Sequence, residues 1–181
     1  MKDYFAILNL EPALVLPTSD VEAAWRALND TSADSGESSS DWNEARSVLS
    51  DDVRRLEHWL KLKAPDEPAD RSIDPSLMDL FSAIGPAIAT TEDVIARQRT
   101  ATTALAKALL TKEAIAAQLQ IQEMLGKTGA AKNGLIAEFP RFEEEAAQGN
   151  FASASRALGQ LKFLKRWEEQ CQEKLLGLIH S

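Results

Sequence analysis

The chain has 181 residues, with 20 Lys and Arg, 28 Asp and Glu and a formal net charge of -8. Hydrophobic residues make up 44% of the chain, a share that suffices for a core in one domain or two small ones and is typical of soluble helical proteins. Residues 1–70 hold the whole acidic excess, with 7 basic against 15 acidic side chains, so we expect no binding to nucleic acid there.

The chain also lacks the signals of a membrane or secreted protein. Its longest apolar runs, such as residues 13–16 and 104–110, are far shorter than the roughly 20 residues that span a bilayer. The N-terminus has no signal-peptide pattern, so we predict a cytoplasmic protein. A single cysteine, Cys171, can form neither an internal disulfide nor a thiolate cluster, and we expect a structural thiol.

The first 62 residues predict short helices. Apolar residues between positions 4 and 10 indicate a short helix or turn that ends at Pro12, and Ser19-Asp20 can cap a second helix. Residues 29–41 contain no apolar residue larger than alanine and predict a mobile loop. Helical spacing then resumes, with a new cap at Ser50-Asp51. Three tryptophans on these apolar stripes are predicted to be core residues: Trp25, Trp42 and Trp59.

Residues 63–71, KAPDEPADR, carry two prolines and three acids but no large apolar residue. Such a segment cannot bury much surface, so it predicts a linker or turn. We therefore divide the chain into a helical domain at 1–63, a linker at 64–72 and a helical bundle at 73–181. The whole protein is predicted to be all-α.

The bundle should begin at Asp74, which can cap a helix with Pro75 at its first position. Gly85-Pro86 should kink or restart that helix. Residues 87–125 predict one long helix, or two with a break near 100–103 or at Thr111. Residues 126–134, GKTGAAKNG, predict a hairpin turn, and helices should follow at 135–147 and 151–179. The apolar positions read as a repeating helical face are Ile88, Val94, Ile95, Leu105, Leu109, Ile115, Leu119 and Leu125.

Two ends of the chain resemble one known family. The segments DYFAILNLEP (3–12) and FASASRALGQLKFLKRWEEQCQEKLLGLI (151–179) look like the iron-sulfur cluster co-chaperones of the HscB type, which join a J-domain to a helical bundle. WNEARSVLSDDVRRLEHWLKLK (42–63) resembles the third and fourth helices of that J-domain. The resemblance implies a J-like domain at 1–63 and an antiparallel three-helix bundle at 73–181.

The motif that makes a J-domain active is missing. In the family, His-Pro-Asp between the second and third helices couples chaperone binding to ATP hydrolysis. This chain has only His58 and His180, and neither precedes Pro-Asp. The family's basic second helix is also replaced, because Arg26 stands among Asp20, Glu22 and Asp30. We therefore expect contact with a DnaK-type chaperone to be weakened or lost.

The resemblance also implies a partner surface on the bundle. If Leu77-Met78 matches the leucine-methionine pair of the family's first bundle helix, then Leu77, Met78, Phe81 and Phe163 form the apolar part of the surface that binds the iron-sulfur scaffold protein. Its acidic part is absent, since Ser82 and Gly85 stand where the family has glutamates. A second register places residues 118–125 on that helix and leaves 74–111 as an extra segment. In either register these side chains also fit a bundle core.

No catalytic, metal or cofactor site emerges from the remaining motifs. Gly126-Lys127-Thr128 lacks the earlier glycine of a phosphate loop, and two scattered histidines do not assemble a nucleophile and base. The acidic runs 143–145 and 168–169 are interpreted as solvated faces, and Lys162, Lys165 and Arg166 as a basic patch that could bind an acidic partner. We therefore expect no enzyme.

Two functions remain after these exclusions. The first is a non-catalytic adaptor, related to co-chaperones, that binds a client or iron-sulfur scaffold protein through its bundle without stimulating chaperone ATPase. The alternative is a structural or regulatory helical module that has lost both ancestral partners and self-associates through the long helix.

Overall fold

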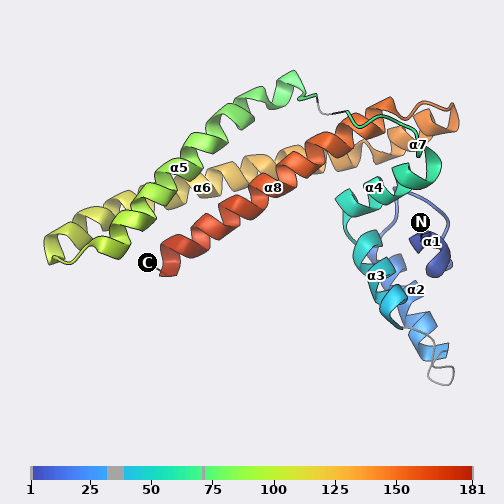
Figure 1. The fold of residues 1–181 in the computed structure, drawn as a ribbon, viewed down its shortest axis with the longest axis horizontal. Helices are drawn as coiled ribbons and strands as arrows, with labels where there is room; N and C mark the ends of the chain where they lie inside the picture. Colours follow the sequence, from blue (N-terminus) through green and yellow to red (C-terminus); the bar gives the residue numbers. More distant parts are fainter. Residues whose placement is uncertain (1, 32–38, 71, 181) are drawn as a thin grey trace. The chain divides into compact units, whose positions relative to one another are not determined.

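The computed structural model describes residues 2–31, 39–70 and 72–180, and within these ranges it contains helices and no strand. The predicted all-α fold is confirmed. In chain order the elements are α1 (Tyr4–Ile7), α2 (Thr18–Thr31), α3 (Ser39–Leu49), α4 (Asp52–Lys63), the 3-10 turn η2 (Pro75–Leu77), α5 (Met78–Thr100), α6 (Ala104–Ala137), α7 (Phe139–Ala147) and α8 (Ala152–His180) (Figure 1).

The chain forms two compact units. The first consists of Met1–Arg71 together with Ile136–Gly159, and the second of Ser72–Leu135 together with Gln160–Ser181. The first unit therefore recruits a late segment of the chain that contains α7. Between α4 and η2 the described residues are not helical. The predicted domain limits, 1–63 and 73–181, stay a prediction.

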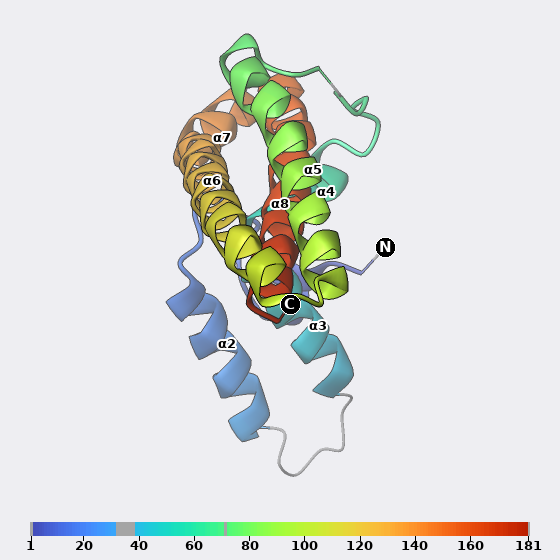
Figure 2. The same ribbon diagram turned by 90° about the vertical axis from the view of Figure 1, so that its left-hand side faces the viewer.

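Caps and apolar spacing shape the first unit. Asp3 caps α1 and Asp51 caps α4, each accepting two backbone N–H groups with its carboxylate. α2 and α3 lie side by side, and α1 packs against α3 (Figure 2). The core that they enclose is fully buried: Phe5, Leu8, Leu14, Val21, Ala45, Leu49 and Leu56.

A buried arginine completes this core. Arg55 is 3% exposed, and its Nε donates to the carbonyl of Leu14 at 3.1 Å while Nη1 donates to the carbonyl of Leu49 at 2.6 Å. Its Nη2 pairs with Asp52. The guanidinium therefore satisfies backbone acceptors that would otherwise be buried without a donor.

The late segment is fixed to the first unit by several specific contacts. Glu143 Oε1 accepts the backbone N–H of Leu14 at 2.5 Å, and the rings of Trp59 and Phe151 lie 5.8 Å apart between centroids. Ser155 Oγ donates to the carbonyl of Pro68 at 2.8 Å. The interpretation of Glu143 as a solvated side chain is wrong, because its carboxylate binds backbone.

The second unit is a bundle of α5, α6 and α8. Its central cluster joins all three helices through buried Ile84, Ala87, Ile88, Ile121, Met124 and Cys171. Successive helices connected by short segments run antiparallel, so the predicted antiparallel bundle is confirmed (Figure 1). Thr91 and Thr128 are buried, and each hydroxyl donates a hydrogen bond to the backbone carbonyl four residues earlier, at Ala87 and Met124.

One ion pair crosses between each pair of bundle helices. Their N–O distances are 2.6 Å for Arg97 and Glu113 (α5 and α6), 2.5 Å for Lys132 and Glu168 (α6 and α8), and 2.9 Å for Lys174 and Glu92 (α8 and α5). Glu168 was expected on a solvated face, but it is only partly exposed and holds α8 to α6.

Several predicted boundaries are wrong. Residues 126–134 form no hairpin turn, because α6 runs through them to Ala137. Of the kink or restart predicted at Gly85-Pro86, the restart does not occur, because α5 continues through Pro86. The break predicted near 100–103 is confirmed, since α5 ends at Thr100 and α6 begins at Ala104. The predicted loop at 29–41 is helical at both ends, and its residues 32–38 lie outside the described ranges.

Two of the tryptophans predicted as core are only half-buried. Trp59 is 3% exposed, whereas Trp25 and Trp42 keep part of their surface in solvent. The Trp25 indole donates to Asn43 at 3.0 Å, and the guanidinium of Arg46 lies 4.3 Å from its ring centroid. Trp25 therefore joins α2 to α3 through a polar and cationic contact at the surface.

Candidate functional site

The start of the bundle places an apolar pair at the surface. Asp74 accepts the N–H of Ser76 at 2.8 Å, and Pro75 occupies the first position of the turn that precedes α5. Leu77 ends this turn and Met78 begins α5. Phe81 follows Leu77 by four residues and Met78 by three, so the three side chains share one face of the helix.

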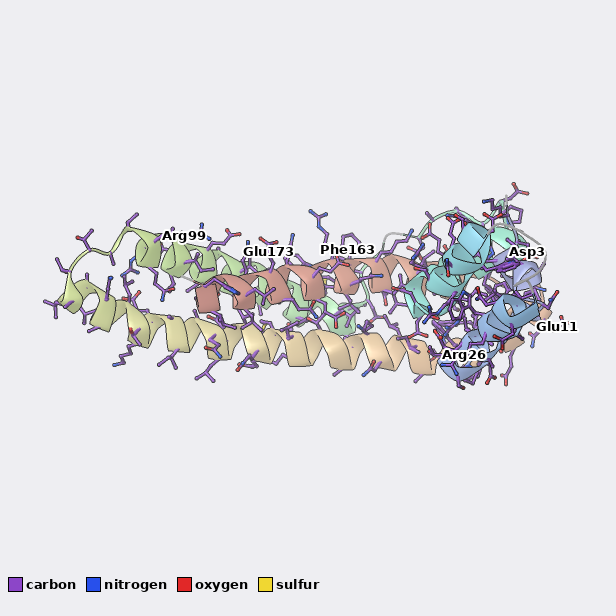
Figure 3. All side chains as sticks on the ribbon, turned by 90° about the horizontal axis from the view of Figure 1, so that it is seen from below. Asp3, Glu11, Arg26, Arg99, Phe163 and Glu173 are labelled. Carbon is purple, nitrogen blue, oxygen red and sulfur yellow. The ribbon has the colours of Figure 1, made fainter. Side chains whose placement is uncertain are left out.

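A second helix contributes to the same surface. The Phe81 ring on α5 meets the Phe163 ring on α8 edge to face, with centroids 6.1 Å apart. Figure 3 labels Phe163 on the side of α8 that is turned away from α6. We call Leu77, Met78, Phe81 and Phe163 the α5–α8 patch. The structure therefore brings Phe81 and Phe163, two of the residues that the resemblance singled out, into contact.

The patch remains accessible. Met78 is 53% exposed and Phe163 is 38% exposed, whereas Leu77 and Phe81 are half-buried. A bundle core would bury all four, so the alternative of ordinary core packing does not fit Met78 and Phe163. Exposed Met and Phe side chains held on two rigid helices form a surface suited to binding an apolar segment of another protein.

The two registers differ in which segment they place on the family's first bundle helix. Ile84 and Ile88 of α5 are buried against Ile121 and Met124, so α5 is an integral helix of the bundle. Residues 118–125 lie in the middle of α6, the next helix along the chain. The choice between the two registers stays a prediction.

The charges around the patch are basic on the α8 side. Lys162 precedes Phe163, and Arg166 follows it one helical turn later; both are exposed. On the α5 side, Ser82 is exposed and Gly85 is half-buried, where the family has glutamates. A partner with acidic groups around an apolar centre would therefore fit this surface better than a basic partner.

In the first unit, α2 and α3 contain the segments that the sequence resemblance compares with the second and third J-domain helices. The residues between them, 32–38, read SADSGES and contain neither His nor Pro. Glu22 of α2 pairs with Arg46 of α3 at 2.6 Å, while Arg26 is exposed on α2 (Figure 3). The exposed surface of α2 is therefore not the strongly basic one that the family presents.

The two buried groups with shifted pKa values, His58 and Cys171, belong to the packed interior. His58 is 5% exposed, its Nε2 accepts the Tyr4 N–H at 3.0 Å, and burial lowers its pKa against the opposing charge of Asp3. Burial raises the pKa of the Cys171 thiol, which lies in the bundle core. Over the described ranges, no cluster of three or more His, Cys, Asp or Glu is placed to hold a metal ion.

Comparison with solved structures finds proteins of similar fold. The structure resembles chaperone HscB from Vibrio cholerae with a TM-score of 0.57 and 19% sequence identity, over 95% of this chain and 96% of that one. No family model and no curated protein matches the sequence. The chain therefore has an HscB-like fold along nearly its whole length. Within the described residues, no helix is both long and apolar enough to cross a membrane.

Sequence reasoning missed one surface. Four large apolar side chains of α6 that it assigned to the repeating helical face are exposed: Leu105 at 72%, Leu109 at 62%, Ile115 at 55% and Leu119 at 62%. The opposite face of the same helix is the buried one, through Leu110, Ala117 and Ile121. The sequence does indicate a second apolar surface, because apolar residues occur on both faces of this helix.

Proposed function

We propose that this protein is a non-catalytic adaptor of co-chaperone type, which binds a client or iron-sulfur scaffold protein through the α5–α8 patch and does not stimulate chaperone ATPase. The observation that carries the proposal is the contact between the rings of Phe81 and exposed Phe163, beside exposed Met78 at the start of α5, on an HscB-like fold. In the family that the sequence resembles, the corresponding side chains form the apolar part of the scaffold-binding surface.

The J-like unit supports the second half of the proposal. A J-domain needs the histidine and the proline-fixed turn of His-Pro-Asp between its second and third helices. Here residues 32–38 supply neither, and α2 carries acids beside Arg26. We infer that the unit serves as a support for the bundle rather than as an activator of a chaperone, and that the protein performs no reaction of its own.

Binding to a purified iron-sulfur scaffold protein from the source organism, measured by isothermal titration calorimetry, tests the adaptor role. Met78→Ala combined with Phe163→Ala should weaken binding at least about tenfold, because truncating the apolar anchors of an interface removes most of its affinity. Both side chains are exposed, so the fold should be unaffected.

Leu176→Ala combined with Ile179→Ala is the matched control, since these α8 residues are 57% and 69% exposed but lie outside the patch. This control variant should bind like the wild type. Scaffold binding that both pairs of substitutions leave unchanged would place the interface elsewhere. A wild type that does not bind the scaffold would refute this partner.

A further inference from the structure

The exposed face of α6 follows a regular pattern. From Leu105 onward, exposed positions recur at alternating intervals of four and three residues, the spacing of a coiled-coil seam. The residues at these positions are Leu105, Leu109, Lys112, Ala116, Leu119, Glu123, Gly126 and Ala130. The seam is about 38 Å long at 1.5 Å per residue. We call it the α6 seam.

The α6 seam lies opposite the buried face of the helix. Leu110, Ala117, Ile121 and Met124 pack into the bundle, whereas every seam residue is exposed. Side chains project from the side of α6 that is turned away from α8 (Figure 3). Three exposed leucines on a rigid helix are costly to leave in water unless another surface covers them.

We propose that the α6 seam binds the same seam of a second copy of this chain, with the two helices antiparallel. One register makes the seam complementary to itself. In that register, the two-fold axis pairs Leu105 with Ala130, Leu109 with Gly126, Lys112 with Glu123 and Ala116 with Leu119, and each pair occurs twice.

Size and charge match in every layer of this register. Each leucine faces a glycine or an alanine, so the helices can approach closely without a clash between large side chains. No heavy atom lies within 4 Å of the position that a Gly126 Cβ would occupy, so the surface beside this residue is open to a leucine. Lys112 and Glu123 meet as opposite charges in both directions.

Other arrangements lose this complementarity. Parallel helices in register would place Lys112 against Lys112 and Glu123 against Glu123. Antiparallel helices displaced by one heptad would place Glu123 against Leu105 or against Leu119. Glu123 pairs with Lys127 on its own helix at 2.6 Å. Both side chains are exposed, so the replacement of Lys127 by Lys112 of the second copy costs little free energy.

Sedimentation equilibrium over a range of protein concentrations tests the proposal. The apparent mass should rise from the 19.8 kDa of one chain toward twice that value. Lys112→Glu and Glu123→Lys should each weaken the dimer at least about tenfold, because each places like charges in contact twice. The combination of both substitutions reverses every pair, so it should restore the dissociation constant to within about threefold.

Leu176→Glu is the matched control, because it places a charge on an exposed apolar residue of α8 and should leave the dimer intact. Circular dichroism should confirm that all variants remain folded. A wild type that stays monomeric up to about 0.5 mM, as it would if a different protein covered the seam, would overturn the proposal. So would a double variant that associates no better than the single variants.

Discussion

The N-terminus of the chain is attached to α4 through a neutral histidine. His58 Nε2 accepts the N–H of Tyr4, and the rings of Tyr4 and Phe5 lie 4.6 and 5.7 Å from the imidazole. Asp3, which caps α1, lies 3.9 Å from the same nitrogen. Protonation would place a proton on the atom that accepts this hydrogen bond, in a site that already disfavours charge because it is buried.

This arrangement predicts a pH-dependent stability. Burial lowers the pKa of His58 below its ordinary 6.5, so between the two values the unfolded chain binds more protons than the folded one. The free energy of unfolding should therefore decrease as the pH falls below about 6.5 toward the folded-state pKa, and the full contribution should be present above 6.5. Urea titrations at pH 5 to 8 would measure this change.

A His58→Gln variant provides the comparison. It should be less stable than the wild type throughout, and it should lose the part of the pH dependence due to this imidazole. His180→Gln, which alters the exposed last turn of α8, is the control and should keep the wild-type profile. A His58→Gln variant with an unchanged pH profile would contradict the assignment.

The helices differ in how far local sequence predicts them. The starts of α4 and of the turn η2 that precedes α5 could be predicted, because Asp51 and Asp74 are followed by residues that suit a helix N-terminus. The course of α6 through Gly126, Gly129 and Gly134 could not, because glycine is the strongest local sign of a turn. The buried faces of Met124 and Thr128 and the Lys132–Glu168 pair maintain the helix there, and these tertiary contacts are invisible to local propensity.

The glycines of α6 give a direct test of this correction. No heavy atom lies within 4 Å of a Cβ added at Gly129, and the residue is outside the α6 seam. Gly129→Ala should therefore stabilise the protein by about 0.5–1 kcal/mol, the usual gain in a helix interior, as measured by denaturant unfolding. A loss of stability of similar size would indicate that these residues form a turn in solution.

The candidate site was predictable only as far as the resemblance extended. Leu77, Met78, Phe81 and Phe163 could be named in advance, but their spacing alone also fits a core, and only the structure shows Met78 and Phe163 exposed. The sequence placed Leu105 and Leu119 on a repeating helical face and allowed self-association through the long helix, but it did not show which residues of α6 are exposed. A sequence shows that a helix has two apolar faces, but it does not show which face the rest of the bundle covers.

Over the whole molecule, fold and activity have different requirements. Buried apolar positions maintain an HscB-like fold at 19% identity to the Vibrio cholerae protein, because a core tolerates many changes that conserve volume and pattern. Activity of a J-domain instead depends on a few exposed residues, and residues 32–38 contain no His-Pro-Asp. We therefore propose a protein with an HscB-like fold that does not stimulate a chaperone.

Single-turnover ATP hydrolysis by the DnaK-type chaperone of the source organism tests this claim most directly. A chaperone mixed with excess of this protein should hydrolyse ATP at its basal rate, while an HscB-type co-chaperone with intact His-Pro-Asp accelerates the same preparation. Acceleration of several-fold by this protein would contradict the proposal, because stimulation would then not require His-Pro-Asp.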